Sequence, residues 1–482
     1  MVEKSIKKNA FYSFLKAFMT LIFPIITFPY ASRILLPEGI GKVNFANSII
    51  SYFVMLGSLG IGTYGTREIA KNKENKLEVS KILKELLLIN FITTLIATVL
   101  FVFSFFFIKQ FKEYQSILLI CSLNIVFTPL GLDWYYRGLE EFKYITVRSF
   151  LFQLLSVIFL FTFVKTEDDL LLYTLIGIIS SVGSNICNII HARKSVFLKI
   201  DSKLELKKHL KPILIFFASS VSISIYTMLD TSMIGFLSND NQVGLYSAAN
   251  KINRMLLGVI TATIGVILSR LSFYNNQNKK EEFYNLANKC FRYILIVSVP
   301  CAVGLFLLSK PIILLFSGSQ YVEAVDTMKI LSPIIVIISI GVFLNGNILP
   351  SLGKEKYGLI AVTSGAIINF VLNIFFIKKW QAFGAGLSTL ITEFSITLIQ
   401  LFFTRKIFIN KENLITLIKV VIATIVMFAI LEIVYRKFNM PIFQIVICMI
   451  SGIFIYSCLL FLLREKEFIN LIKLKVFSRN KI

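Results

Sequence analysis

Long apolar runs separated by short polar and often basic stretches form the main pattern along this chain. Runs of about 18 or more apolar residues are typical of helices that cross a lipid bilayer. About fourteen such runs occur, at 9–33, 42–64, 82–107, 114–136, 145–165, 170–190, 213–237, 243–269, 286–308, 323–350, 358–377, 383–404, 414–435 and 441–463. The pattern predicts an all-α, polytopic membrane protein with about fourteen transmembrane helices.

The number of basic residues alternates from one connection to the next. About 10 Lys and Arg lie in the odd-numbered connections, whereas about 36 lie in the termini and the even-numbered connections. Loops rich in Lys and Arg stay in the cytoplasm, so both termini are predicted to be cytoplasmic. The most basic connection, 193–212, is predicted to be a solvated linker, with a specific lipid or partner contact as the alternative.

Two short segments recur at corresponding places in the two halves of the chain. GKVNFANSI at 41–49 and GLYSAANKI at 244–252 open the second and eighth runs, and LEEFKY at 139–144 and LGKEKY at 352–357 follow the fourth and tenth. Six runs separate each pair, so the halves share one orientation and form a parallel repeat, unless the matches arise by chance. We therefore expect an N-terminal six-helix lobe at 1–192, a basic linker at 193–212, a C-terminal six-helix lobe at 213–405, and two further helices with a basic tail at 406–482.

The composition fits a membrane protein and excludes several other classes. The 482 residues are 56% hydrophobic, and the mean hydropathy is +0.77. The net charge of +23 does not indicate nucleic-acid binding, because the basic residues lie between apolar runs and no nucleic-acid motif accompanies them. Membrane lipids are the expected partners of these loops. No connection exceeds about 22 residues, so no folded catalytic domain fits outside the membrane and no enzyme is expected.

The cysteines and histidines predict no metal site. The six cysteines fall in apolar runs and have no metal-ligand spacing, and both histidines, His191 and His209, are placed in the basic loop. A histidine-based metal site or catalytic base inside the membrane is therefore not expected.

Three ionisable residues occur at similar depth in the seventh and eighth runs. Asp230 and Lys251 lie roughly 10 and 12 Å from the polar turn at 238–242 that joins these runs. Arg254 follows Lys251 by three positions, so the two cations share a helix face, and Asn250 precedes them in the repeated segment. Charges at membrane depth face a packed interior or a hydrated cavity. The three groups therefore form either a closed salt bridge or an anion site with one positive charge in excess.

Four further charged residues in the N-terminal half have structural interpretations. Lys16 in the first run is expected to extend toward the cytoplasmic interface or to pair structurally, and Arg33 near the outer end to anchor at that interface. Asp133 and Arg137 are four positions apart, which favours an ion pair on one helix face at the cytoplasmic end.

The C-terminal half has two more charges inside its apolar runs. Lys329 lies roughly 10 Å from the outer end of the tenth run, and Glu393 lies near the middle of the twelfth. A carboxylate at that depth is a candidate carrier of a proton or sodium ion. An ion pair between Glu393 and either Lys329 or Arg254 is an alternative of equal weight.

Four segments of the sequence resemble one membrane-protein family. SRILLPEGIGKVNFANSI at 32–49, GTYGTREIAKNK at 62–73, DWYYRGLEEFKYITVRS at 133–149 and LDTSMIGFLSNDNQVGLYSAANKI at 229–252 are similar to the O-antigen- and capsule-type polysaccharide repeat-unit flippases. These belong to the multidrug/oligosaccharidyl-lipid/polysaccharide exporter superfamily, and the resemblance runs over nearly the whole chain. It implies two six-helix lobes around a V-shaped cavity that opens alternately to the two sides.

The resemblance also implies a cargo and a location. The cargo is an undecaprenyl-diphosphate-linked oligosaccharide, moved from the inner to the outer leaflet of the bacterial cytoplasmic membrane for capsule, O-antigen or a related polymer. No cofactor is implied, and coupling to H⁺, Na⁺ or the membrane potential stays open. Polysaccharide polymerase and glycosyltransferase machinery are the expected protein partners.

A diphosphate is a concentrated anion and needs cationic partners. Lys251 and Arg254 are the expected residues for this head group, with help from Lys16, Arg33 and Lys329. A lipid II flippase shares this cargo chemistry and is the nearest alternative. A multidrug exporter would favour a cavity rich in carboxylates, and a membrane glycosyl polymerase would carry a large outer loop. The sequence has neither feature.

Overall fold

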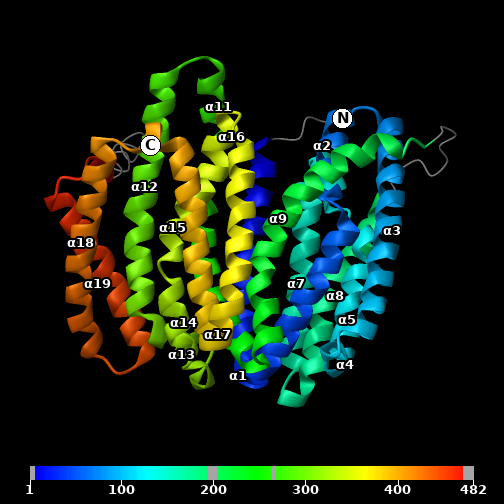
Figure 1. The fold of residues 1–482 in the computed structure, drawn as a ribbon, viewed down its shortest axis with the longest axis horizontal. Coiled ribbons are helices and arrows are strands. Elements are labelled where there is room, and N and C mark those ends of the chain that lie inside the picture. The colour runs from blue at the N-terminus through cyan, green and yellow to red at the C-terminus, as the bar shows by residue number, and fades with distance from the viewer. Residues whose placement is uncertain (1–5, 194–203, 263–266, 471–482) are drawn as a thin grey trace. The chain divides into compact units, whose positions relative to one another are not determined.

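The computed structural model describes residues 6–193, 204–262 and 267–470, and all regular structure in these residues is helical (Figure 1). The predicted all-α class is therefore confirmed. Contacts divide the chain into two compact units, Met1–Gly244 and Leu245–Ile482. This boundary differs from the lobe boundary expected at 193–212, because the helix that follows the linker packs against the first two helices of the chain. The division into two lobes stays a prediction.

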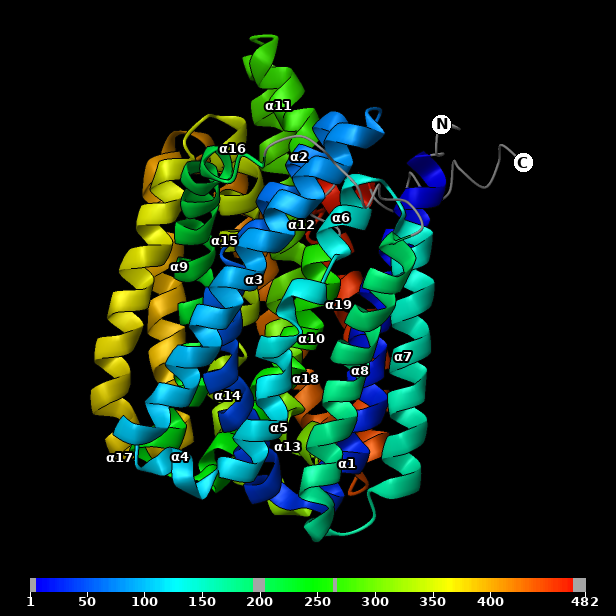
Figure 2. The ribbon, with the colours of Figure 1, turned by 90° about the vertical axis from the view of Figure 1, so that its right-hand side faces the viewer.

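In the residues that the structure describes, the first unit consists of nine α-helices and the start of a tenth. They are α1 (Ile6–Ser58), α2 (Ile61–Asn72), α3 (Lys76–Phe107), α4 (Gln110–Glu113), α5 (Gln115–Val126), α6 (Asp133–Gly138), α7 (Phe142–Phe163), α8 (Leu170–Ala192), α9 (Lys207–Leu237) and the first turn of α10 (Asp240–Ala262), with 3-10 turns η1 (Thr128–Leu130) and η2 (Glu167–Asp169). Helices α7 and α8 run side by side (Figure 2).

The first helix is interrupted where the sequence places a proline. Leu36 has φ 57° and ψ 176°, and Pro37 follows it. A residue before proline is disfavoured in the helical region, so the helix breaks at Leu36. The element α1 therefore contains the first predicted run before the break and most of the second run after it. The second run ends earlier than expected, because Leu59 and Gly60 both adopt positive φ. A Cβ at Gly60 would lie 2.7 Å from the backbone nitrogen of Phe217, so this turn requires glycine.

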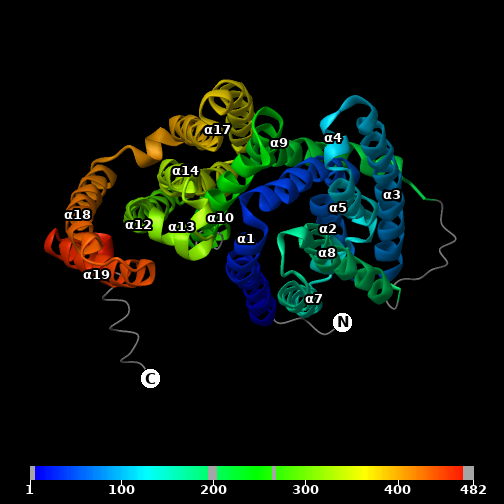
Figure 3. The same cartoon turned by 90° about the horizontal axis from the view of Figure 1, so that it is seen from below.

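The second unit begins within α10 and contains the remaining helices. They are α11 (Leu268–Asn276), α12 (Lys280–Leu307), α13 (Ser309–Phe316), η3 (Ser319–Tyr321), α14 (Ala324–Leu331), α15 (Ile334–Phe343), the π-helical segment η4 (Leu344–Ile348), α16 (Leu349–Ser351), α17 (Glu355–Phe408), α18 (Lys411–Arg436) and α19 (Pro441–Leu462). Helices α18 and α19 lie side by side (Figure 3).

Three predicted runs of the second unit differ from simple helices. The tenth run is divided among α14, α15, η4 and α16, with Pro333 and Pro350 near the divisions, because proline cannot donate the helical hydrogen bond. The eleventh and twelfth runs form α17, which breaks at Gln381 (φ 50°, ψ −126°). A Cβ at Gly365 would lie 2.4 Å from Ile396, so the two halves of α17 pack against each other.

Nine helices of the described chain are long and apolar enough to cross a membrane, or ten if the bent pair α5 and η1–α6 forms one span with a 41° bend. Each of α1 and α17 contains a break, so the number of crossings is not the number of helices. The protein is a multi-pass membrane protein, and the count of about fourteen spans stays a prediction.

Each unit has its own apolar core. In the first unit, Trp134, Tyr135 and Tyr136 pack with Ile69 and Leu86 among α2, α3 and α6. In the second, one cluster joins α12, α15 and α17, and another joins α12, α18 and α19.

Candidate functional site

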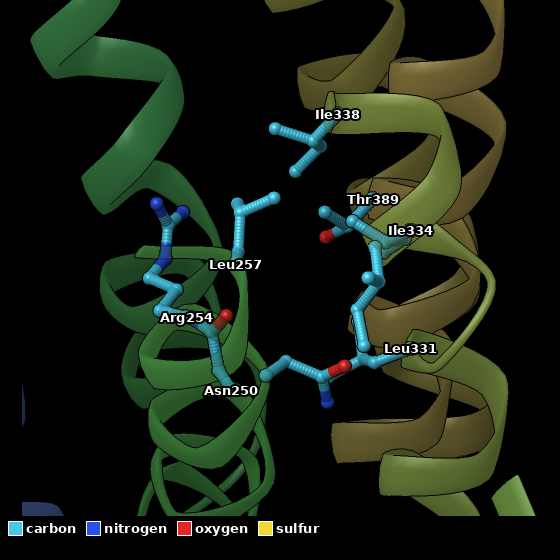
Figure 4. A pocket seen from close by; sticks show the side chains of 9 residues that line it. Asn250, Arg254, Leu257, Leu331, Ile334, Ile338 and Thr389 are labelled. Carbon is cyan, nitrogen blue, oxygen red and sulfur yellow. The ribbon is translucent and has the colours of Figure 1, made fainter. Parts of the chain in front are cut away.

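A hollow in the second unit is the candidate site (Figure 4). Its volume is about 310 Å³, including the part that is open to solvent. It is lined by residues of α10, of the α14–α15 region and of α17: Asn250, Asn253, Arg254, Leu257, Leu331, Ile334, Ile335, Ile338 and Thr389. One wall is therefore polar and cationic, and the opposite wall is mostly aliphatic.

Helix α10 presents its polar side chains to this hollow because of their spacing. Asn250, Arg254 and Leu257 follow one another at intervals of four and three residues, which places them on one helix face. Figure 4 shows Leu257 facing Ile334 and Ile338 across the hollow, with Arg254 beside it on α10 and its guanidinium directed along the helix. The helix begins at Asp240, where the side chain of Asn239 accepts the backbone N–H of Gln242 at 3.0 Å and acts as an N-cap.

Arg254 gives the hollow its positive charge. Its side chain is exposed, and it makes no ion pair or hydrogen bond with the described residues. Thr389 contributes a hydroxyl from α17 that donates to the Ala385 carbonyl at 2.9 Å and lies 3.4 Å from the Tyr246 hydroxyl. A guanidinium beside amides and an aliphatic wall can bind an anionic group that is attached to an apolar chain.

The other predicted residues of the seventh and eighth runs lie in different surroundings. Lys251 is partly buried on α10, outside the lining of the hollow, and has an interaction partner. Asp230 is 6% exposed on α9 and lies close enough to Tyr52 to interact with it electrostatically. Asp230 belongs to the first unit, whereas Lys251 and Arg254 belong to the second. The expected cluster of all three residues stays a prediction.

Asp133 is held by two cations from other helices. Lys16 Nζ of α1 donates to Asp133 Oδ2 at 2.8 Å, and Arg148 of α7 donates to Asp133 Oδ1 at 2.6 Å. The expected pair with Arg137 is wrong for the part of the chain that the structure describes, because the Asp133 carboxylate is already bonded to the two other cations. For Lys16, structural pairing, one of the two expected outcomes, is confirmed.

The remaining predicted residues do not gather at the hollow. Arg33 donates to the Pro29 carbonyl within α1, and Lys329 pairs with Asp326 at 3.4 Å within α14, where both side chains are exposed. Glu393 is 7% exposed on α17 and has an interaction partner. Neither Lys329 nor Glu393 lines the hollow.

Sequence reasoning missed three residues of these sites. Arg148 lies in the fifth apolar run, and the rule that intramembrane charges have a role could have identified it. Asn253 and Thr389 are uncharged, and nothing in their sequence surroundings separates them from other polar residues of membrane helices.

At the level of the fold, the protein is similar to a solved flippase. The structure described as "Lipid II flippase MurJ, inward closed conformation" superposes with a TM-score of 0.73 at 17% identity, covering 94% of this chain and 97% of that one. The chain is thus an α-helical, multi-pass membrane protein with the fold of the multidrug/oligosaccharidyl-lipid/polysaccharide exporters. It belongs to the family described as "Polysaccharide biosynthesis protein", whose profile matches residues 6–274.

Curated relatives and a second family profile agree with this membership. A MatE profile matches residues 216–375. Proteins named "Putative O-antigen transporter" from Shigella dysenteriae and Escherichia coli (strain K12) are 26% and 24% identical, over 82% and 83% of this chain and 99% and 97% of their own lengths. The family resemblance expected from the sequence is therefore confirmed.

Proposed function

We propose that this protein is a flippase for lipid-linked oligosaccharides. It moves undecaprenyl-diphosphate-linked repeat units from the inner to the outer leaflet of the bacterial cytoplasmic membrane by alternating access. The observation that carries the proposal is the family membership, together with alignment over 82% of the chain to a relative named as an O-antigen transporter. Both termini lie in the cytoplasm, as the distribution of basic residues indicates.

The hollow in the second unit has suitable chemistry for the head group of this cargo. Arg254 offers a guanidinium to the diphosphate, and Asn250 and Asn253 offer amides to the phosphates or the first sugar. The aliphatic wall formed by Ile334 and Ile338 suits the start of the prenyl chain. Lys251, on α10 but outside the lining of the hollow, and Arg33 are further cations for the head group in this proposal, and Lys16 acts through its pair with Asp133.

Energy input belongs to the same proposal. Asp230 and Glu393 are carboxylates on membrane helices with little exposure, so each is a candidate for carrying a proton or a sodium ion during the cycle. The membrane potential is the alternative source. The protein performs no catalytic step of its own and acts between the glycosyltransferases that build the repeat unit and the polymerase that uses it.

Deletion of the gene tests this function. Lipid-linked oligosaccharide should accumulate in the cytoplasmic leaflet, and a plasmid copy of the gene should restore surface polysaccharide. The leaflet is read by oxidising the glycan with a membrane-impermeant reagent before and after permeabilisation. Accumulation in the outer leaflet would instead identify a polymerase defect, and accumulation of peptidoglycan precursors would identify a lipid II flippase. Unchanged glycan lipids with increased sensitivity to cationic drugs would identify a multidrug exporter.

A further inference from the structure

A buried carboxylate and a buried histidine meet at the start of α9, far in sequence from any residue of the proposed cargo site. Glu85 of α3 is fully buried, and His209 of α9 is 1% exposed. His209 Nε2 lies 2.8 Å from Glu85 Oε2. The other carboxylate oxygen, Glu85 Oε1, accepts the backbone N–H of Glu205 at 2.7 Å. One side chain of α3 thus binds both the segment that leads into α9 and the first turn of that helix.

This contact lies at a helix start that has no cap of its own. Within the described residues, helix α9 begins at Lys207 with no side-chain cap and no acidic residue in its first turn. The first backbone N–H groups of a helix have no partner within the helix, and a carboxylate near them is stabilising. Glu85 supplies this negative charge from a different helix, and Lys208 in the first turn of α9 forms an ion pair with it at 3.3 Å, which adds a further contact between α3 and α9. The position of the start of α9 therefore depends on Glu85.

His209 can keep its hydrogen bonds in two protonation states. Its second nitrogen, Nδ1, lies 2.7 Å from the hydroxyl of Tyr64 of α2. With a neutral ring, Nε2–H donates to Glu85 and the Tyr64 hydroxyl donates to Nδ1. With a charged ring, both nitrogens donate, and the Tyr64 oxygen accepts after its hydroxyl rotates. Proton binding therefore needs no rearrangement of heavy atoms, and it turns a hydrogen bond to a carboxylate into an ion pair.

The charges around the latch are unequal in number when His209 is neutral. Glu78 and Glu85 of α3 and Glu205 are three carboxylates, and Lys81 and Lys208 are the two ammonium groups paired with them. On α2, the charges that interact with Tyr64 are one of each sign, Arg67 and Glu68. The hydrogen bond from Lys208 lowers the pKa of the exposed Glu205 carboxyl, so this group stays ionised at neutral pH. The cluster therefore has one negative charge in excess when His209 is neutral and none when it is protonated.

We propose that Glu85, His209 and Tyr64 form a proton-binding latch that fixes the start of α9 against α2 and α3. A proton on His209 tightens the latch, and loss of the proton loosens it. The latch is independent of the cargo and of Arg254. It makes the start of α9 responsive to pH through the protonation of one buried ring.

Amide hydrogen exchange of the full-length protein in detergent tests the latch. After correction for the intrinsic dependence on pH, peptides covering residues 204–213 should be roughly tenfold more protected at pH 6 than at pH 8, if the latched state binds the proton about tenfold more tightly than the opened state. In His209→Gln, the amide can still donate to Glu85 but cannot take up a proton. Its protection should therefore be the same at both pH values.

The chain offers a matched control, because it has only two histidines. His191 stacks on Tyr144 with ring centroids 4.0 Å apart and lies at the end of α8. The variant His191→Gln should keep the full pH response at 204–213. A response that persists in His209→Gln, or that disappears only in His191→Gln, would overturn the proposal.

A second variant covers the case in which His209→Gln does not fold. In Glu85→Gln, the histidine remains but its acidic partner loses its charge, so the increase in protection should move to lower pH. An unchanged midpoint in this variant would show that Glu85 does not hold the proton, and the latch would be rejected. Loss of transport by either variant is not needed for the proposal, so its failure is distinct from failure of the flippase function.

Discussion

Arg254 has the charge on which the proposed head-group site depends. Arg254→Ala removes the guanidinium from the hollow, and we expect transport to fall roughly tenfold to a hundredfold, the usual effect of losing a charge-assisted hydrogen bond. Restoration of surface polysaccharide in a deletion strain measures this, with membrane abundance determined in parallel. Arg254→Lys should retain part of the activity, because the charge remains but the two-pronged geometry does not.

Lys329→Ala is the matched control for Arg254. Lys329 is a cation of the same unit, but it pairs within its own helix and is exposed. Its removal should leave transport unchanged, since a surface ion pair contributes little. Full activity of Arg254→Ala at normal abundance would remove the head-group assignment, whereas equal losses in both variants would point to a general effect of charge.

Asp133 is expected to act on stability. In Asp133→Asn, Arg148 and Lys16 keep their charges without the carboxylate between them, and Arg148 is 7% exposed. We expect the free energy of unfolding to fall by about 1–3 kcal/mol, because Asp133 is partly exposed and water replaces part of the lost interaction. Thermal unfolding in detergent measures the change. Arg137→Ala should have no effect on stability. A larger loss of stability in Arg137→Ala than in Asp133→Asn would favour the pair of Asp133 with Arg137 that is expected from the sequence.

Residue-level prediction from the sequence is limited by the choice of partner. The existence of charges inside apolar runs is visible in the sequence, and this identifies Arg254 and Lys16. Their partners are not visible, because Lys16 and Asp133 are 117 positions apart and belong to different helices. Local spacing favours a partner four residues away, and the packing of α1, α6 and α7 overrides this preference.

At the scale of elements, the repeated segments meet each other in the structure. A Cβ at Gly41 of α1 would lie 1.8 Å from the carbonyl oxygen of Asp240, and a Cβ at Gly244 would lie 1.9 Å from the carbonyl oxygen of Pro37. Each glycine therefore contacts the carbonyl four positions before the other. This reciprocal contact brings the two repeated segments together, and the parallel repeat itself stays a prediction.

Gly41→Ala and Gly244→Ala should each destabilise the first unit. The added methyl group meets a backbone oxygen, which cannot move away as a flexible side chain can, so the two helices must separate. We expect a loss of about 1–3 kcal/mol, typical of overpacking. Thermal unfolding and membrane abundance measure it.

Two other glycines serve as controls for this contact. Gly62 of α2 and Gly177 of α8 have open space where a Cβ would be placed. Alanine at these positions should be neutral or stabilising, because alanine favours a helix more than glycine does. If all four variants behaved alike, close backbone contact would not explain the effect of Gly41 and Gly244.

Hydropathy indicates some breaks between helices but not others. Leu36 and Gln381, which leave the helical region, both fall between predicted apolar runs. The tenth run is predicted as a single helix, and it is divided near Pro333 and contains the π-helical segment Leu344–Ile348. Hydropathy shows where a chain enters lipid, but turns and prolines decide where a helix stops.

At the scale of the whole molecule, sidedness is the prediction that joins the sequence to the transport direction. Helix α12 separates Asn278, in a connection expected to be cytoplasmic, from Ser319, in a connection expected to be outside. The basic residues Lys279 and Lys280 adjoin the first position, and the positive-inside bias places that end in the cytoplasm. The inner-to-outer direction of the proposed flippase requires this orientation.

A membrane-impermeant maleimide applied to intact cells tests this orientation. Ser319→Cys should be labelled directly, whereas Asn278→Cys should be labelled only after permeabilisation. The native protein provides the background, since Cys121 and Cys290 are buried and the exposed Cys458 lies within the apolar helix α19. Because each connection of a multi-pass chain alternates in side, one crossing more or fewer before α12 would reverse both results. The reversed pattern would therefore invalidate the predicted set of spans, and with it the cytoplasmic assignment of the start of α9 and the leaflet from which cargo is taken.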